Sequence, residues 1–111
     1  MPHLPMTTDA TFGSDVLASP MPVLVDFTAD WCAPCTMVAP TLERIAAEEA
    51  GRMRVVALDA DTNPETVRAY GVMGMPTLAL FVGGELVAQV VGARSQQALM
   101  KAFEPHLGAR V

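Results

Sequence analysis

Positive charge is scarce in this sequence: seven Lys and Arg oppose twelve Asp and Glu, which gives the 111 residues a formal net charge of −5. Nucleic acid and anionic lipid both select a basic surface, so we expect neither as a partner. Long apolar runs are missing too, since all fall far short of the roughly 20 residues that cross a bilayer. No Lys or Arg precedes Arg44, so we expect no secretory leader and a cytoplasmic protein.

Cysteine is equally sparse, and Cys32 and Cys35 are the only two. The loop between them is too short to restrict the unfolded chain much, so the pair is not there to stabilise the fold. Apolar residues, in contrast, are abundant, at 51% against 17% charged. This composition excludes disorder and supplies a core, so we expect residues 1–111 to form a single domain.

Strand and helix patterns alternate along the chain. Residues 1–7 are loosely ordered or at best a short edge strand, because Pro2 and Pro5 lack a backbone donor. Gly83-Gly84 joins two apolar segments as a β-hairpin. The apolar spacing predicts strands at 23–27, 54–58, 77–82 and 85–91, and helices at 8–18, 33–50, 63–71 and 95–107.

These elements predict an α/β fold. Strands that alternate with helices imply parallel pairing through right-handed crossovers, and the terminal hairpin adds antiparallel edges. A central mixed sheet of four or five strands, with helices on both faces, follows. The N-terminal caps expected for the first, third and last helices are Thr8 or Asp9, Asn63 and Ser95.

Two helices have an expected orientation. In the first, Phe12, Val16 and Leu17 share the apolar face. The long helix, which Pro40 should kink, has an apolar stripe and a solvent face. We place Val38, Leu42, Ile45 and Ala46 on the stripe, Glu43, Glu48 and Glu49 on the solvent face, and Leu99, Phe103 and Leu107 on one face of the last helix.

Cys32-Ala33-Pro34-Cys35 directly follows the first long strand and opens the long helix. Unpaired N–H groups and the helix dipole concentrate positive potential at a first turn, which favours a thiolate. Cys32 is most exposed to that field, so we assign it as the attacking nucleophile, open to visiting proteins, and Cys35 as the resolving thiol. Pro34 fits the first turn of the helix and stiffens the segment that joins the two cysteines. This spacing beside a βαβ unit is a known signature of a redox-active pair.

Two other interpretations of the pair remain. Thiolates at this spacing also suit zinc, but tetrahedral zinc takes four ligands, and the spare histidines, His3 and His106, lie at opposite ends of the chain. We therefore expect no metal. A passive structural pair is the second alternative.

A larger set of residues resembles the thioredoxin family, in order and at that family's spacing. The matching segments are 25–35 (VDFTADWCAPC), Pro40, 74–77 (GMPT), Gly83-Gly84 and 91–93 (VGA). The resemblance covers nearly the whole chain. It implies the thioredoxin fold and a general protein-disulfide reductase in which Cys32 and Cys35 cycle between dithiol and disulfide. It implies no bound cofactor, because electrons come from NADPH through thioredoxin reductase, and disulfide-containing proteins as the substrates. We expect a monomer.

Asp26 is the charged residue within an apolar strand. One interpretation is a strand-end carboxylate that leans into solvent, since charged side chains avoid full burial. Between Val25 and Phe27, however, a carboxyl group should have a raised pKa and could hold or accept a proton. In thioredoxins the matching aspartate is buried behind the active-site pair and assists proton transfer for the second thiol. The resemblance assigns that role to Asp26.

Pro76 begins a strand, where an ordinary proline would be trans. The resemblance instead implies a cis Met75–Pro76 bond that faces the cysteines and leaves the Met75 backbone free to pair with an extended substrate. Trp31 is either a core residue or a lid on the site, and its place beside the nucleophile favours the lid. Ala33 and Pro34, which lie between the two cysteines, are the other residues expected to support the pair.

Met73 and Met75 are either core filler or part of a docking surface. With Gly74, Gly92 and Ala93 they correspond to the shallow apolar surface around the thioredoxin active site. Adaptable methionines beside small residues suit a surface that accepts many protein partners, so we expect loose selectivity.

Three positions depart from the family pattern. Ala33 replaces the usual glycine between the cysteines, which restricts the backbone and shifts the redox potential modestly. Thr36 stands where a basic residue is common, and Ala57 where a lysine often neighbours the buried aspartate. Without that lysine, Asp26 should hold its proton to higher pH than in lysine-bearing relatives.

The fold by itself allows more than one function. The first is an electron carrier that reduces protein disulfides, and the alternative is a binding or chaperone subunit that uses the redox pair as a switch. The joint presence of Cys32, Cys35, Asp26 and Pro76 favours catalysis. A disulfide-forming oxidant would normally work outside the cytoplasm, and no export signal supports it.

Overall fold

The computed structural model describes residues 3–109. Its centre is a five-stranded mixed sheet with the order β1-β3-β2-β4-β5, which confirms the predicted architecture. Parallel pairing joins β1 to β3 and β3 to β2, while β4 is antiparallel to both β2 and β5. The strands are β1 (Met6–Thr7), β2 (Val23–Thr28), β3 (Arg54–Asp59), β4 (Thr77–Val82) and β5 (Glu85–Val91). Residues 1–2, part of the segment predicted to be loose or an edge strand, lie outside the described residues.

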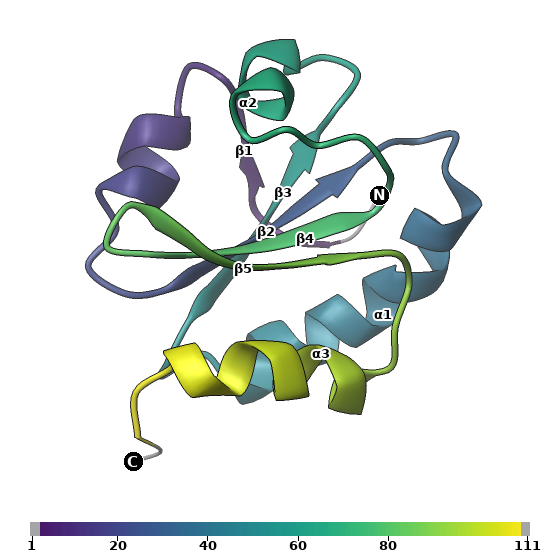
Figure 1. Ribbon diagram of the computed structural model, residues 1–111. Coiled ribbons are helices and arrows are strands. Elements are labelled where there is room, and N and C mark those ends of the chain that lie inside the picture. Colours follow the sequence, from purple (N-terminus) through teal and green to yellow (C-terminus); the bar gives the residue numbers. More distant parts are fainter. Residues whose placement is uncertain (1–2, 110–111) are drawn as a thin grey trace.

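Helices cover both faces of the sheet (Figure 1). One face packs against α1 (Ala33–Glu48) and α3 (Gln96–Phe103), and a 3₁₀ turn, η2 (Glu104–His106), follows α3. The other face packs against the π-helix η1 (Gly13–Leu17), against α2 (Pro64–Ala69) and against the residues that directly follow α2. The sheet therefore has no solvent-exposed centre, as the nearly continuous apolar runs of its strands predicted.

The central strand β2 is buried along its whole length. Side chains alternate between the two faces of a strand. Val25 and Phe27 belong to the apolar cluster under η1 and α2, and Leu24 belongs to the one under α1 and α3. Asp26 has the parity of Leu24, so its carboxyl group lies on the α1 side of the sheet. This placement positions the acid of the candidate site.

The first helix is shorter than predicted. Residues 9–11 form turns, and the helical part covers only Gly13–Leu17. Phe12 and Val16 are buried as expected, but Leu17 is exposed. Thr8 does accept a hydrogen bond from the Thr11 N–H through its side chain, as a cap would. Asp9 does not cap this helix, because its carboxylate is engaged elsewhere.

Asp9 instead caps α2, across a long separation in sequence. Its two carboxylate oxygens accept hydrogen bonds from the backbone N–H groups of Glu65 and Thr66, at 3.1 and 2.9 Å. Asn63, the predicted cap, uses its side chain to join two loops: Oδ1 accepts from the Asp9 N–H and Nδ2 donates to the Asp59 carbonyl. Asn63 stands at the N-cap position of α2, as predicted, but its side chain makes no capping hydrogen bond, because the charged Asp9 supplies that bond from elsewhere in the chain.

Glu49 also departs from its prediction, since it is buried rather than on the solvent face. The Nε of Arg52 donates to Glu49 Oε1 at 2.9 Å, and the same guanidinium pairs with Glu104 beyond α3. A carboxylate is buried at tolerable cost only with such a partner. Arg52 thus ties the end of α1 to the C-terminal part of the fold.

The last helix has the predicted start and a different end. The Ser95 hydroxyl accepts a hydrogen bond from the Ala98 N–H at 3.1 Å, which confirms the cap. Regular α-helix ends at Phe103, because Pro105 lacks the N–H that a further turn requires. Leu107 therefore follows the helix, and it is half-buried against the same core as Leu99 and Phe103.

Candidate active site

Cys32 stands at the junction between β2 and α1, where it is the N-cap of the helix. Its backbone is extended, and its Sγ accepts a hydrogen bond from the Cys35 N–H at 3.2 Å. The two cysteines form a disulfide with a Cα–Cα distance of 5.3 Å. Ala33 and Pro34 occupy the exposed first turn between them, as predicted. The cysteine sulfur thus takes the place that a Ser or Asp oxygen takes at other helix starts.

The pair is less open than expected. Cys32 is only 3% exposed and Cys35 2%, so the expectation that Cys32 stands free at the helix tip is wrong for the disulfide form. The physical reason is packing, because Ala29 is buried with the two cysteines and Met75 packs against all three. In the disulfide form, Met75 therefore covers part of the pair.

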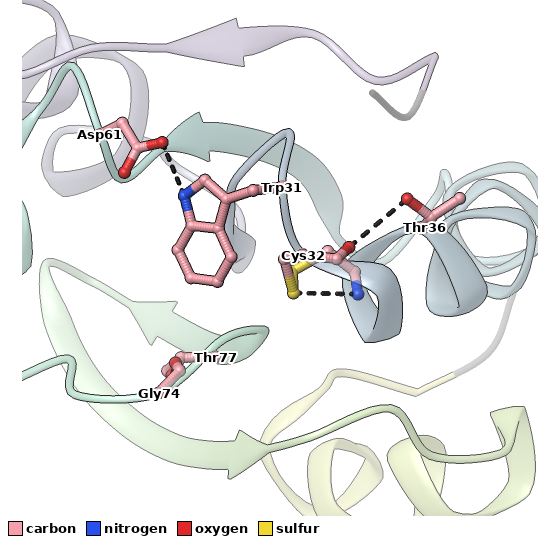
Figure 2. Close-up of a disulfide and its surroundings, with 7 residues drawn as sticks. Trp31, Cys32, Thr36, Asp61, Gly74 and Thr77 are labelled. Atoms are coloured by element: carbon pink, nitrogen blue, oxygen red, sulfur yellow. Dashed lines mark hydrogen bonds between the residues drawn. A yellow bond between two sulfur atoms is a disulfide. The ribbon is translucent and has the colours of Figure 1, made fainter.

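Met75 and Pro76 come from the loop before β4, and the peptide bond between them is cis, as the resemblance implied. In Figure 2, Gly74 of this loop and Thr77 at the start of β4 lie across from Trp31 and Cys32. The Thr77 hydroxyl donates to the Gly74 carbonyl at 2.6 Å. Within residues 3–109, the Met75 N–H and carbonyl take part in no hydrogen bond.

The loop after β5 joins the same surface. Gly92 donates its N–H to the Pro76 carbonyl at 2.9 Å, and its φ of 102° is one that residues with a side chain rarely adopt. A Cβ added to Gly74 would lie 3.4 Å from Val91 Cγ1, so these two loops are in direct contact. Ala93 is exposed beside them. Val91 is a member of the surface that sequence reasoning did not single out.

We use the term active-site surface for the residues that these loops and the helix start bring together. Trp31 is 70% exposed, which excludes the core interpretation, and Met73 is 97% exposed. Met37, which sequence reasoning missed, is 73% exposed on α1 just beyond the pair. The active-site surface comprises Trp31, Met37, Met73, Gly74, Met75, Val91, Gly92 and Ala93.

Asp61 is a further residue that sequence reasoning missed. Its Oδ2 accepts a hydrogen bond from the Trp31 indole Nε1 at 2.9 Å, drawn in Figure 2. Asp61 follows β3 and Trp31 follows β2. The sequence could have indicated this contact, because residues that follow neighbouring parallel strands meet at the same edge of the sheet. Asp61 fixes the orientation of the exposed indole over the site.

This contact can be tested with fluorescence, since Trp31 is the only tryptophan in the sequence. Asp61→Ala removes the acceptor, so we expect faster local motion of the indole and a lower fluorescence anisotropy. Asp30→Ala removes an exposed neighbouring carboxylate and is the matched control. Equal anisotropy in Asp61→Ala and the wild type would show that the hydrogen bond does not hold the ring.

Asp26 is completely buried, so the interpretation that it leans into solvent is wrong. Ala57 and Leu78 are its partners on the two neighbouring strands, and neither offers a charge or a side-chain donor. Both carboxyl oxygens lack a hydrogen-bond partner within the described part of the chain. Burial therefore raises the pKa of Asp26 to about 7. The carboxyl group can take up and release a proton near neutral pH.

Residues 3–109 contain neither a cluster of metal ligands nor a helix that could span a membrane. No group of three or more His, Cys, Asp or Glu side chains is arranged to hold a metal ion. None of the helices in that range has both the length and the apolar character that crossing a membrane requires.

Comparisons with known proteins agree with this geometry. The family model described as Thioredoxin matches residues 3–104. A thioredoxin of Mycobacterium tuberculosis is 55% identical over 94 residues, which are 85% of this chain and 81% of that protein. A thioredoxin of Synechocystis is 46% identical over 107 residues, covering 96% of this chain and 100% of the relative. A bifunctional thioredoxin reductase/thioredoxin of Mycobacterium leprae is 53% identical over 94 residues, 85% of this chain and 20% of that protein.

Proposed function

Because this chain belongs to the thioredoxin family and is a protein-disulfide reductase with a Cys32–Cys35 redox pair, we propose that Cys32 attacks the substrate disulfide and that Cys35 resolves the intermediate. The observation that carries this assignment is the helix cap: Cys32 Sγ accepts the Cys35 N–H at 3.2 Å at the positive end of α1. A thiolate at that position gains a charge-assisted hydrogen bond and the helix dipole. Cys35 lies one turn further into α1, so it is not the cap that receives this hydrogen bond.

The cycle consists of two thiol–disulfide exchanges. The Cys32 thiolate attacks one sulfur of the substrate, the substrate S–S bond breaks, and one substrate thiolate leaves. The Cys35 thiol then loses its proton and attacks Cys32 Sγ in the mixed disulfide. The second substrate thiolate leaves, and the Cys32–Cys35 disulfide remains. Two electrons have passed to the substrate.

Asp26 is the proposed acceptor for the Cys35 proton. It lies on the side of the sheet that α1 covers, and Cys35 is one of the buried residues of α1. Its pKa of about 7 allows the carboxylate to take a proton at neutral pH. Ala57 brings no lysine beside Asp26, so burial is the cause of the raised pKa. A higher pKa than in lysine-bearing relatives stays a prediction.

Substrate proteins are proposed to dock on the active-site surface. The unpaired backbone of Met75 supports antiparallel pairing with an extended substrate segment. The proposed docking residues are Trp31, Ala33 and Pro34 on the helix side and Met73, Gly74, Gly92 and Ala93 on the loop side, while Pro76 is buried and supports the loop. The apolar character of this surface supports broad rather than narrow selectivity.

A thioredoxin reductase that consumes NADPH is the proposed electron source. The Mycobacterium leprae relative, whose name joins thioredoxin reductase and thioredoxin in one protein, supports this partner. Electrons then arrive by disulfide exchange, and the chain needs no bound cofactor of its own. We propose that the protein works in the cytoplasm, as a monomer and as a single domain.

The proposal predicts NADPH consumption that depends on three components. A mixture of a bacterial thioredoxin reductase, this protein and insulin should consume NADPH continuously as insulin disulfides are reduced. Omitting this protein should reduce the rate to the background of reductase with insulin. A binding subunit that uses the pair only as a switch would give a single stoichiometric turnover, and that result would contradict the proposal.

A further inference from the structure

The methionines of this chain differ widely in exposure. The sequence has eight methionines, of which Met73 is 97% exposed and Met53 1% exposed. Met73 directly precedes the loop that carries Gly74 and Met75, and Met75 packs against the two cysteines. The most exposed thioether described in the chain thus stands at the edge of its redox site.

We propose that Met73 is a modification site: peroxides oxidise it to the sulfoxide, and the sulfoxide weakens the docking of substrate proteins. The consequence for docking rests on the proposed function of the active-site surface. The oxidation itself rests on exposure, because the access of an oxidant to a thioether governs how fast the sulfur reacts.

The chemistry is a single oxygen transfer. The Met73 sulfur attacks one oxygen of hydrogen peroxide, the O–O bond breaks, an S–O bond forms, and water leaves. The sulfur loses the two electrons that the peroxide gains. In the disulfide form, neither Cys32 nor Cys35 has a free thiolate that would consume the peroxide first. The oxidised carrier is therefore the form in which Met73 is the target.

The effect on docking follows from the surroundings of Met73. Its neighbour Gly74 lies against the side chain of Val91 at the end of β5, and Met75 packs against the two cysteines. These neighbours present apolar surface, and a partner that covers them must also cover position 73. A sulfoxide there has a strong hydrogen-bond acceptor, which loses its water on docking without gaining a donor from this surface.

The site can be mapped by treating the disulfide form with hydrogen peroxide and following each methionine by peptide fragmentation and mass spectrometry. We expect Met73 to be oxidised first, Met37 (73% exposed) after it, and Met53 last. Oxidation of Met73 no faster than that of Met53 would overturn the proposal.

The consequence is measured as kcat/KM for insulin after treatment, divided by the value for the same variant before treatment. With treatment stopped once Met73 is converted and before Met37 is, we expect this ratio to be about one fifth for the wild type and for Met37→Leu, through a higher KM. For Met73→Leu we expect it to stay near one. Reduction of a small aromatic disulfide, which needs no docking surface, should be unchanged by treatment in all three proteins.

The outcomes separate this inference from the proposed function. If untreated protein turns over insulin and full conversion of Met73 to sulfoxide leaves the ratio at one, the inference is wrong and the reductase mechanism stands. If Met37→Leu is protected and Met73→Leu is not, the sensitive residue is misassigned and the inference is again wrong. If untreated protein does not reduce insulin at all, both the inference and the proposed function fail.

Discussion

Replacing Cys32 by serine should lower kcat/KM for insulin disulfide reduction by roughly a thousandfold or more, because the nucleophile of the first exchange is lost. A serine hydroxyl at the α1 N-cap can accept the Cys35 N–H as the cysteine sulfur does, so the fold keeps its helix start. The remaining Cys35 is buried one turn deeper, where a protein disulfide has little access. The variant therefore removes the nucleophile and keeps the fold.

Cys35→Ser is the matched control, and it should fail in a different way. Cys32 still attacks, but nothing resolves the intermediate, so the variant should accumulate as a mixed disulfide with its substrate. Mass spectrometry without reductant detects this adduct directly. We expect the adduct with Cys35→Ser and not with Cys32→Ser. The reverse result would exchange the roles of the two cysteines.

Alkylation of the reduced protein gives a second measurement on the same assignment. The helix dipole and the Cys35 N–H favour a thiolate at Cys32, so iodoacetamide should modify Cys32 well before Cys35 at neutral pH. If Cys32 reacts only as fast as an unactivated thiol in a short peptide, the carrier mechanism has lost its physical basis.

Asp26→Asn should stabilise the protein at pH 8 and change its stability much less at pH 4. The pKa of Asp26 is about 7 in the folded protein, against 3.8 as its ordinary value. Between these values the unfolded chain has released the proton and the folded chain has kept it. Because the unfolded state then binds fewer protons, the free energy of unfolding falls as pH rises, and it levels off above pH 7. Asparagine does not titrate, so the variant does not lose this part of the free energy of unfolding as pH rises.

The size of the effect follows from the two pKa values. The stabilisation by Asp26→Asn should grow by an amount on the order of 4 kcal/mol between pH 4 and pH 8. Urea unfolding at both pH values measures it, with the pair kept as the disulfide so that neither thiol titrates. Asp30→Asn, at an exposed neighbouring position, controls for the loss of a formal charge. Equal stabilisation at both pH values would mean that Asp26 is not held protonated by burial.

The same variant also tests the proton transfer assigned to Asp26. Without the carboxylate, Cys35 has no internal acceptor for its proton, so resolution of the mixed disulfide should slow near neutral pH and recover as hydroxide takes over. A pH profile of insulin reduction identical to that of the wild type would contradict the assigned role. The stability result and the kinetic result are independent, because burial alone produces the first.

Much of the fold and of the site follows from local patterns in the sequence. The apolar run at 23–27 predicted a fully buried strand, and β2 is that strand. The sequence placed Cys32 and Cys35 at the junction of a strand and the long helix, and the structure has them at the start of α1. The hairpin at Gly83-Gly84 and the Ser95 cap are equally local. Each of these features depends on residues within about one turn of helix or one strand of each other.

Other features depended on which polar groups meet once the elements pack. Trp31 and Asp61 are 30 positions apart, and Asp9 caps α2 at Thr66 from 57 positions away. The helical pattern had placed Glu49 in solvent, but its hydrogen bond from Arg52 made its burial possible. The near-complete cover of Cys32 came from Met75, a residue of another loop. Sequence spacing determined the backbone elements and the reactive pair, because those depend on hydrogen bonds and side-chain periodicity over a few residues. Only the tertiary structure decided which polar side chains are partnered and which groups are reachable, because burial and pairing are properties of surfaces brought together from distant parts of the chain.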